Sequence, residues 1–284
     1  MSNNQQNNWY RLIAKRKYPA LLWPLLLMAL LPPPLSGQEA NLPIIAIIID
    51  DMGHHQAIGK RFIALPYPLT LSFLPYRAHT QTLARQAHDA GKEIMLHTPM
   101  ESTSGIALGK GALHSGMSRL SLITSLRKQI RSLPFISGVN NHMGSALTQN
   151  GEIMRWLMSE LKQYPLYFVD SRTIASSVAA NISRQYQIPT QERDVFLDHK
   201  VSAQAIDHQF NRLLGIAKKK GYAIAIGHPH LLTLHYLEKA LPLLGEKGIA
   251  LTTISGLNGL DRATGRRSSH HFKPDKNRFE LSLR

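Results

Sequence analysis

The chain has 284 residues, 43% of them hydrophobic, with 33 lysines and arginines against 18 acidic residues. This length and composition favour one large domain with a substantial core. Cysteine is absent, which excludes disulfides and thiolate metal ligands, so any metal would be held by histidines and carboxylates.

The first 40 residues are predicted to be a secretory signal peptide and leader. A basic segment precedes the apolar residues 20–31, and prolines follow them. A membrane span is the alternative, but these twelve residues fall short of the roughly 20 that cross a bilayer. Cleavage near Gly37 is expected, and retention as an uncleaved anchor stays open. The protein is therefore expected to be exported to the periplasm or cell envelope.

The charge of the exported chain indicates the chemistry of its partner. Loss of residues 1–37 removes four of the 33 basic residues and none of the 18 acidic ones, which leaves a net charge of +11. Such a protein favours anionic envelope material, so an envelope glycan or peptidoglycan fragment is the expected partner. Export argues against nucleic acid, and membrane contact is expected only through an uncleaved N-terminus.

The domain begins with a strand that ends in two carboxylates. Residues 44–49 are all apolar, and Asp50 and Asp51 follow them. An unbroken β-branched segment is typical of a strand buried on both faces of a parallel sheet. Because active sites open at the carboxyl ends of such strands, one carboxylate is expected to bind metal and the other to act as a base. A helix N-cap is the alternative for a single aspartate.

Helices and strands then alternate, which favours a parallel α/β sheet or barrel of about eight strands within residues 41–258. The predicted helices are 54–65, 79–90, 118–133, 152–164, 174–186, 202–220 and 234–244. The further predicted strands are 69–74, 93–96, 135–139, 166–169, 195–197, 222–226 and 249–254. Residues 102–116 form a glycine-rich loop, and residues 259–284 are expected to be a disordered basic tail.

His97 and Glu101 follow the predicted strand 93–96. Their i, i+4 spacing would place both on one helical face if Pro99 lies in the first turn. With Asp51 they would form a histidine and carboxylate set that suits zinc or a related divalent ion. The alternative is a capping box, in which Thr98 caps a helix and Glu101 is its third residue.

Three further strand ends carry candidate site residues. His142 follows two turn-prone asparagines and is a third candidate metal ligand. Asp170 and Arg172 are expected to be an ion pair with either an orienting or a structural role. His228 lies between a glycine and a proline, and this rigid backbone suits an imidazole in acid–base chemistry.

Taken together, the segments IIDDMG, HTPME, NNHMGS, VDSRT and GHP resemble the divergent branch of the polysaccharide deacetylase superfamily, a branch of exported bacterial proteins. The resemblance extends from Pro43 to about Ser255. It implies a distorted (β/α) barrel of about seven to eight parallel strands. It also implies a divalent metal, most simply zinc, and removal of acetyl groups from an N-acetylated polysaccharide.

The resemblance assigns roles residue by residue. Asp50 takes the position of the base, Asp51 that of the metal aspartate, and His97 that of the first metal histidine. Glu101 stands where the superfamily has its second metal histidine, and His142 where it has an arginine–proline motif. His228 matches the histidine that acts as the acid. The expected metal set is therefore Asp51, His97 and His142, with Glu101 nearby.

Two functions follow from these observations. The first is a metal-dependent hydrolase that deacetylates an envelope glycan, and the retained Asp50, Asp51 and His228 favour it. The second is a non-catalytic glycan-binding or envelope scaffold protein that kept the barrel, and the departure at Glu101 favours it.

Overall fold

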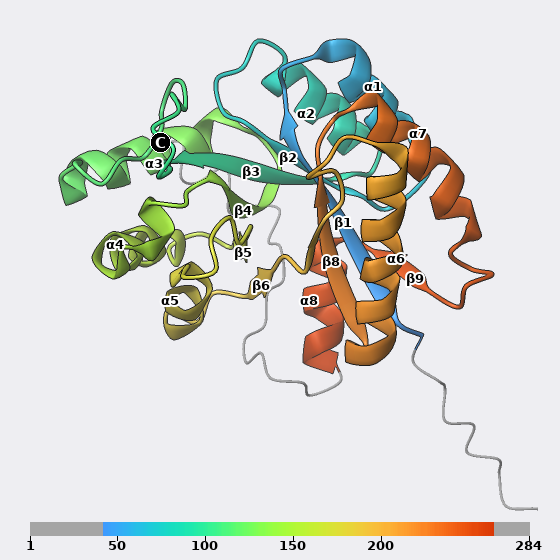
Figure 1. Cartoon of the computed structure of the whole chain (residues 1–284). Helices are drawn as coiled ribbons and strands as arrows, with labels where there is room; N and C mark the ends of the chain where they lie inside the picture. The colour runs from blue at the N-terminus through green and yellow to red at the C-terminus, as the bar shows by residue number, and fades with distance from the viewer. Residues whose placement is uncertain (1–41, 264–284) are drawn as a thin grey trace, which may run out of the picture. The chain divides into compact units, whose positions relative to one another are not determined.

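A computed structural model describes residues 42–263 of the chain. The predicted leader, residues 1–40, and the tail from residue 264 onward lie outside the described residues. Within the described part, strands and helices alternate, and every strand pairing is parallel. Most of the helices lie around the strands (Figure 1). No helix between residues 42 and 263 has both the length and the hydropathy needed to cross a membrane.

The strands are β1 (Ile44–Met52), β2 (Thr70–Phe73), β3 (Glu93–Met100), β4 (Ile136–Met143), β5 (Tyr167–Asp170), β6 (Thr190–Glu192), β7 (Val195–Phe196), β8 (Tyr222–Gly227) and β9 (Ala250–Thr252). The α-helices are α1 (Gln56–Ala64), α2 (Thr80–Asp89), α3 (Arg119–Ser132), α4 (Gly151–Leu161), α5 (Ala179–Gln185), α6 (Ala203–Lys220), α7 (Leu231–Ala240) and α8 (Ile254–Ala263). Two short 3₁₀ helices, η2 (Leu147–Gln149) and η3 (Leu241–Leu243), complete the elements.

The sheet curls so that the strands at its two ends follow one another in the sequence. Its strand order is β6-β5-β4-β3-β2-β1-β8-β7, so β6 and β7 lie at opposite ends of the path. Only Arg193 and Asp194 separate these two strands in the sequence. Arg193 donates a backbone hydrogen bond to Asp170 of β5, and Asp194 donates one to Ile224 of β8. The segment therefore bridges both ends, which confirms the predicted α/β fold with a distorted barrel.

β1 is buried on both faces, as its apolar sequence predicts. β8 pairs with one edge of β1, while β9 and β2 share the other edge. Ile45, Ile47 and Ile49 pack in the core cluster that includes the helices. Ala46 and Ile48 belong to a second cluster with residues of β8. This alternation explains why the strand has no polar position before Asp50.

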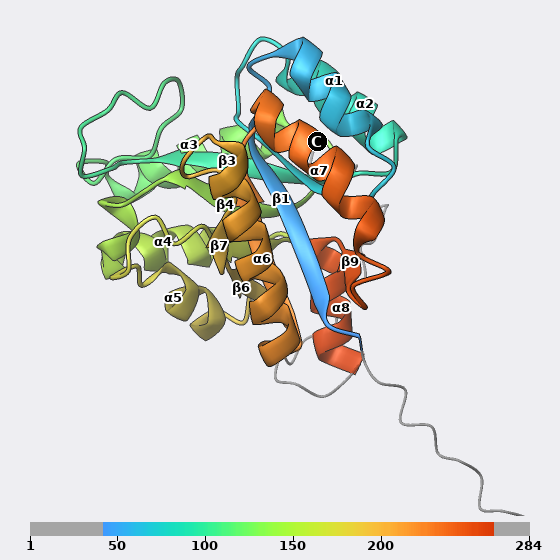
Figure 2. The ribbon, with the colours of Figure 1, turned by 45° about the vertical axis from the view of Figure 1, so that its right-hand side comes forward.

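The interior of the sheet is filled at one end by α8, which the sequence analysis did not anticipate. Ile254 and Leu257 pack in the same cluster as Ala46 and Ile48 of β1. In Figures 1 and 2, α8 lies near the end of β1 at which the described chain begins. The prediction of a strand up to residue 254 was therefore wrong, because β9 ends at Thr252 and the chain enters this helix. The helix continues past the expected tail boundary to Ala263.

Several helix ends match their sequence signals, whereas the start of α5 does not. The side chains of Ser118 and Ser202 cap α3 and α6, and Gly221 ends α6 in a left-handed conformation with φ of 91°. The predicted helix 174–186 begins only at Ala179. The residues before it form a loop around Asp170, which accepts hydrogen bonds from Ser177 and the backbone of Ala180.

Candidate active site

A β-bulge brings the two adjacent aspartates to one side of β1. Ile49 and Met52 of β1 pair with Leu71 and Phe73 of β2, so the ladder gains one residue at this point. Asp51 lies in the left-handed region, with φ of 55°. In a regular strand the two side chains would point to opposite faces. Here Asp50 Oδ2 and Asp51 Oδ1 lie 3.6 Å and 3.2 Å from the same atom, Nε2 of His97.

His97 lies within β3, so the helical interpretation of the segment HTPME was wrong. β3 continues to Met100 and pairs with β4, with His97 opposite Asn140 and Pro99 opposite His142. Pairing with β4 keeps the segment HTPME extended. The local sequence signals gave no indication of this pairing. The asparagines before His142 likewise lie in a strand rather than a turn. Since strands alternate with period two, Asn140 and His142 share one face of β4.

Asp51, His97 and His142 form a group that fits a divalent cation. Asp51 Oδ1 lies 2.9 Å from His142 Nδ1, and His142 Nδ1 lies 3.1 Å from His97 Nε2. One ligand atom from each residue lies within 4.8 Å of the others. Asp51 Oδ1 is buried from solvent. Three converging ligand atoms, two imidazole nitrogens and one buried carboxylate oxygen, match the nitrogen and oxygen ligands that zinc accepts.

The electrostatics of Asp51 also suit a metal ligand. Burial alone would raise the pKa of its carboxyl group. The imidazoles of His142 and His97 outweigh burial and hold the pKa of Asp51 far below its usual range. The carboxylate is therefore ionised at all physiological pH values, as metal binding requires.

Glu101 lies outside the group that Asp51 forms with the two histidines. Its Oε2 accepts a 2.6 Å hydrogen bond from the backbone N–H of Ser115, and hydrogen bonding by the side chain and the backbone of Ser115 lowers the pKa of Glu101. Its backbone oxygen accepts hydrogen bonds from Ala146 and Leu147. Glu101 thus ties the end of the loop 102–116 to the segment that follows β4. Glu101 takes the position of the superfamily's second metal histidine, and in this chain its side chain bonds to Ser115.

The pKa of the Asp50 carboxyl group is shifted in the opposite direction from that of Asp51. The residue is only 2% exposed, and burial raises the pKa of its carboxyl group despite the nearby charges of His97 and His228. Asp50 Oδ1 accepts a 2.8 Å hydrogen bond from Asn140 Nδ2. A carboxylate whose pKa lies above its ordinary value is a stronger base than a free aspartate, which suits a general base.

His228 follows β8 and is held by Asp198. His228 Nδ1 lies 2.8 Å from Asp198 Oδ1, and Asp198 Oδ2 accepts hydrogen bonds from the His228 backbone and from Thr233. Burial would lower the pKa of His228, but Asp198 raises it to about 9. The sequence analysis assigned no role to Asp198. His230 also lies close to Asp198 and His228.

The expected ion pair between the side chains of Asp170 and Arg172 does not form, because the Arg172 guanidinium pairs with another residue. The Asp170 carboxylate accepts hydrogen bonds from Ser177 and from the backbone of Arg172 and Ala180. The Arg172 guanidinium forms a 2.7 Å ion pair with Glu192. Both residues therefore organise the loop between β5 and α5.

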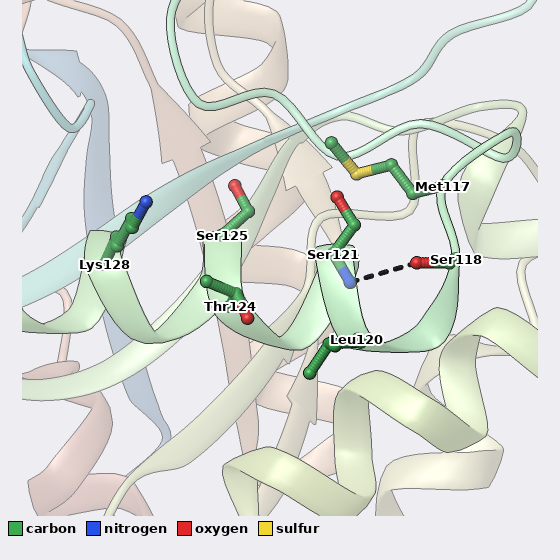
Figure 3. A pocket seen from close by; sticks show the side chains of 7 residues that line it. All are labelled: Met117, Ser118, Leu120, Ser121, Thr124, Ser125 and Lys128. Carbon is green, nitrogen blue, oxygen red and sulfur yellow. Dashed lines mark hydrogen bonds between the residues drawn. The ribbon is translucent and has the colours of Figure 1, made fainter.

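A pocket of about 430 Å³ lies along α3, away from these residues. Figure 3 shows its lining and the cap of the helix, in which Ser121 N–H donates to Ser118 Oγ. The lining residues are Met117, Ser118, Leu120, Ser121, Thr124, Ser125 and Lys128. None of the eight predicted site residues is among them.

Comparison with known proteins identifies related chains. The sequence pattern of the family described as divergent polysaccharide deacetylase matches residues 47–258. The uncharacterized protein YibQ of Escherichia coli is 35% identical over 213 residues, which cover 75% of this chain and 65% of YibQ. The match thus spans less than two thirds of that relative's length.

Two further relatives extend the comparison. An uncharacterized protein of Haemophilus influenzae is 34% identical over 202 residues, covering 71% of this chain and 72% of its own. The crystal structure of an uncharacterized protein of Agrobacterium tumefaciens superposes with a TM-score of 0.74 at 26% identity. That alignment covers 79% of this chain and 92% of the Agrobacterium chain.

Proposed function

The chain belongs to the divergent polysaccharide deacetylase family, and from that premise we propose that it is a metal-dependent hydrolase. Its reaction is the removal of acetyl groups from an N-acetylated polysaccharide of the cell envelope. One observation carries the proposal: Asp51, His97 and His142 converge on one point beside the buried carboxyl group of Asp50. A ligand group next to a carboxyl with a raised pKa is the arrangement that metal-assisted amide hydrolysis needs.

Asp51, His97 and His142 are the proposed ligands, and zinc is the proposed ion because two nitrogens and one oxygen suit it. A divalent ion bound there supplies Lewis acidity, which polarises the acetamide carbonyl and makes water more acidic. Asp51 contributes the negative charge that retains the ion.

Asp50 is the proposed general base. It accepts a proton from the attacking water as the oxygen of that water forms a bond to the acetamide carbonyl carbon. The hydrogen bond from Asn140 leaves Oδ2 of Asp50 on the side of His97, where the ligand group lies. Burial raises the pKa of the Asp50 carboxyl and so makes it a stronger base than a free aspartate.

His228 is the proposed general acid. Its pKa of about 9 keeps the imidazole protonated at neutral pH. Asp198 binds Nδ1, so the Nε2 proton remains available for the substrate nitrogen. When the carbon–nitrogen bond breaks, this proton passes to the leaving amine, and the products are acetate and a free amino sugar.

The substrate is proposed to be an envelope glycan or a peptidoglycan fragment. The family description names polysaccharide, and the excess of basic residues suits anionic wall material. The signal-like segment at residues 20–31 supports export to the periplasm, where such material lies.

A non-catalytic glycan-binding or scaffold protein is the second candidate. The observation that favours it is Glu101, which bonds to the backbone of Ser115 instead of joining the ligand group. Such a protein would keep the barrel and bind glycan without releasing acetate.

Acetate release separates the two candidates. The purified chain, loaded with zinc, is incubated with N-acetylglucosamine oligomers and with peptidoglycan fragments, and a chelator-stripped sample serves as the control. A hydrolase releases acetate from at least one substrate only when zinc is present. Glycan binding without acetate release in the fully loaded protein would favour the scaffold function.

A further inference from the structure

We propose that Asn140 is a positioning residue that fixes the proton of His97 on Nδ1 and thereby directs Nε2 to the metal. The same carboxamide holds the base, Asp50. This inference rests on the proposed function for the roles of Asp50 and His97. Nothing in the sequence motif singles out Asn140, because its neighbour Asn141 is the same residue type and is equally buried.

The partners of Asn140 determine how its carboxamide is oriented. Nδ2 lies 2.8 Å from Asp50 Oδ1, and an ionised carboxylate can only accept a hydrogen bond. The amide nitrogen must therefore face Asp50, and it also donates to Ser171 Oγ at 3.3 Å. The amide oxygen faces the other way, where it accepts a 2.7 Å hydrogen bond from Ser72.

The orientation of Asn140 decides the tautomer of His97. His97 Nδ1 lies 2.8 Å from Asn140 Oδ1, and an amide oxygen can only accept. Nδ1 must therefore carry a proton. In the neutral ring the lone pair is then on Nε2, the atom that lies 3.2 Å from Asp51 Oδ1 and 3.1 Å from His142 Nδ1. This pattern is that of a metal-binding histidine oriented by a second hydrogen bond.

Burial makes Asn140 hard to replace. Asn140 and Ser72 are fully buried, and His97 is 2% exposed. Loss of the carboxamide would leave the Nδ1 proton without a partner in a place that water does not readily reach. The ring could then adopt the other tautomer, which places a proton on the ligand nitrogen.

The amide is the functional group that serves both neighbours. It donates to the carboxylate from β1 and accepts from the imidazole from β3. An aspartate at this position could accept from His97 but would repel Asp50. An alanine could do neither. The two substitutions therefore separate the two contacts of Asn140.

The test compares Asn140→Ala, Asn140→Asp and the control Asn141→Ala in the full chain. Asn141 bonds to the backbone of Met143 and Ser171 and contacts neither Asp50 nor His97 through any hydrogen bond. Zinc affinity is measured by competition with a chelator, and imidazole ¹⁵N shifts report which nitrogen of His97 is protonated in the zinc-loaded protein. Circular dichroism verifies that each variant folds.

The proposal expects three results. Asn140→Ala lowers zinc affinity by about 10- to 100-fold, the usual effect of removing a partner of a metal-binding histidine. Asn140→Asp keeps zinc affinity near that of the wild type, because the carboxylate still accepts the Nδ1 proton, but it loses the contact to Asp50. Asn141→Ala leaves zinc affinity unchanged. In the zinc-loaded wild type, His97 is protonated on Nδ1.

The proposal is wrong if the wild type carries the His97 proton on Nε2, or if Asn140→Asp and Asn140→Ala lose zinc equally. The spectrum of the wild type and the Asn140→Asp variant decide the matter even if Asn140→Ala does not fold. A wild type that binds zinc with Nδ1 protonated but hydrolyses no substrate would refute the proposed function and leave the role of Asn140 intact.

Discussion

Asp50 and Asp51 are adjacent in the chain but have opposite electrostatic environments. Burial raises the pKa of Asp50, whereas His142 and His97 outweigh burial at Asp51 and lower the pKa there. Two carboxyl groups whose pKa values are pushed apart can take different roles, one as proton acceptor and one as permanent anion. The bulge in β1 makes this division possible because it places both groups beside His97.

The first prediction concerns the ligand set. His142→Ala should abolish zinc retention during gel filtration, because it removes one of three converging donor atoms. Glu101→Ala is the matched control and should retain zinc, since Glu101 bonds to Ser115 instead. Elemental analysis of the eluted protein measures both. Retention by His142→Ala together with loss by Glu101→Ala would show that the glutamate is the ligand.

The second prediction concerns the pair of His228 and Asp198. His228 has a folded pKa of about 9 against an ordinary value of 6.5, so its stabilising effect is complete below 6.5 and is lost as the pH rises through 9. Asp198 has a lowered pKa, so its contribution is complete above the ordinary value of 3.8 and is lost only in acid. The pair therefore stabilises the fold most between pH 3.8 and pH 6.5.

Urea unfolding of the chelator-treated protein tests this pH dependence. The difference in the free energy of unfolding between wild type and His228→Asn should be largest at about pH 5.5 and should shrink towards about pH 9.5. A difference that grows with pH would mean that His228 is neutral in the folded protein.

Sequence reasoning named the candidate residues that its motifs contain but missed the hydrogen-bond partners that orient them. Asp50, Asp51, His97, His142 and His228 follow or end hydrophobic strands, which is a local signal. The roles of Asn140 and Asp198 depend on hydrogen bonds to residues far away in the chain. Such contacts are properties of the tertiary structure.

At the scale of elements, local sequence signals were sufficient to predict those helices and strands whose conformation they determine directly. The apolar segment 44–49 predicted β1, and Ser202 with Gly221 delimited α6. The extension of β3 and β4 beyond their apolar parts depends on their mutual pairing, so it could not be predicted from either segment alone. The segment of α8 is short and contains two glycines, so its helical state depends on packing inside the sheet.

The third prediction tests the role of α8. Leu257 is 2% exposed and packs in the interior cluster, so Leu257→Ala should lower the free energy of unfolding by about 2–5 kcal/mol. Leu120 on α3 is 76% exposed, and Leu120→Ala is the control with an expected change within about 0.5 kcal/mol. Urea unfolding measures both. Equal effects would mean that α8 does not contribute to the core.

Glu93 links α8 to the strands at this end of the molecule. Its carboxylate accepts hydrogen bonds from the backbone N–H groups of Ile254 and Ser255, and from the hydroxyls of Thr70 and Tyr167. A carboxylate at a helix N-terminus is favourable because it meets free N–H groups and the positive end of the helix dipole. The hydrogen bonds of Glu93 and the apolar contacts of Ile254 and Leu257 therefore both hold α8 inside the curled sheet.

At the scale of the whole molecule, the parallel sheet has two chemically different ends. The carboxyl ends of β1, β3, β4 and β8 carry the candidate site, whereas α8 packs at the other end of β1. This arrangement follows from parallel pairing, since every strand ends on the same side. It explains how residues from distant parts of the sequence come together without any local motif that spans them.

The fourth prediction concerns the segment before the domain. Residues 11–31 combine four basic residues with an apolar stretch, so the chain should be exported. N-terminal sequencing of protein recovered from the cell envelope should find either cleavage near Gly37 or an intact anchor. Recovery of the full-length chain from the cytosol alone would contradict the envelope location.

The most direct test of the central claim uses Asp50→Asn, which keeps the shape of the side chain and removes its basicity. Acetate release and zinc content are measured together in wild type and variant, with N-acetylglucosamine oligomers and peptidoglycan fragments as substrates. Asp50→Asn should retain zinc, and its turnover should fall by about 10²- to 10⁴-fold, the usual contribution of a general base. Full activity of Asp50→Asn with zinc bound, or a zinc-loaded wild type that releases no acetate, would contradict the account.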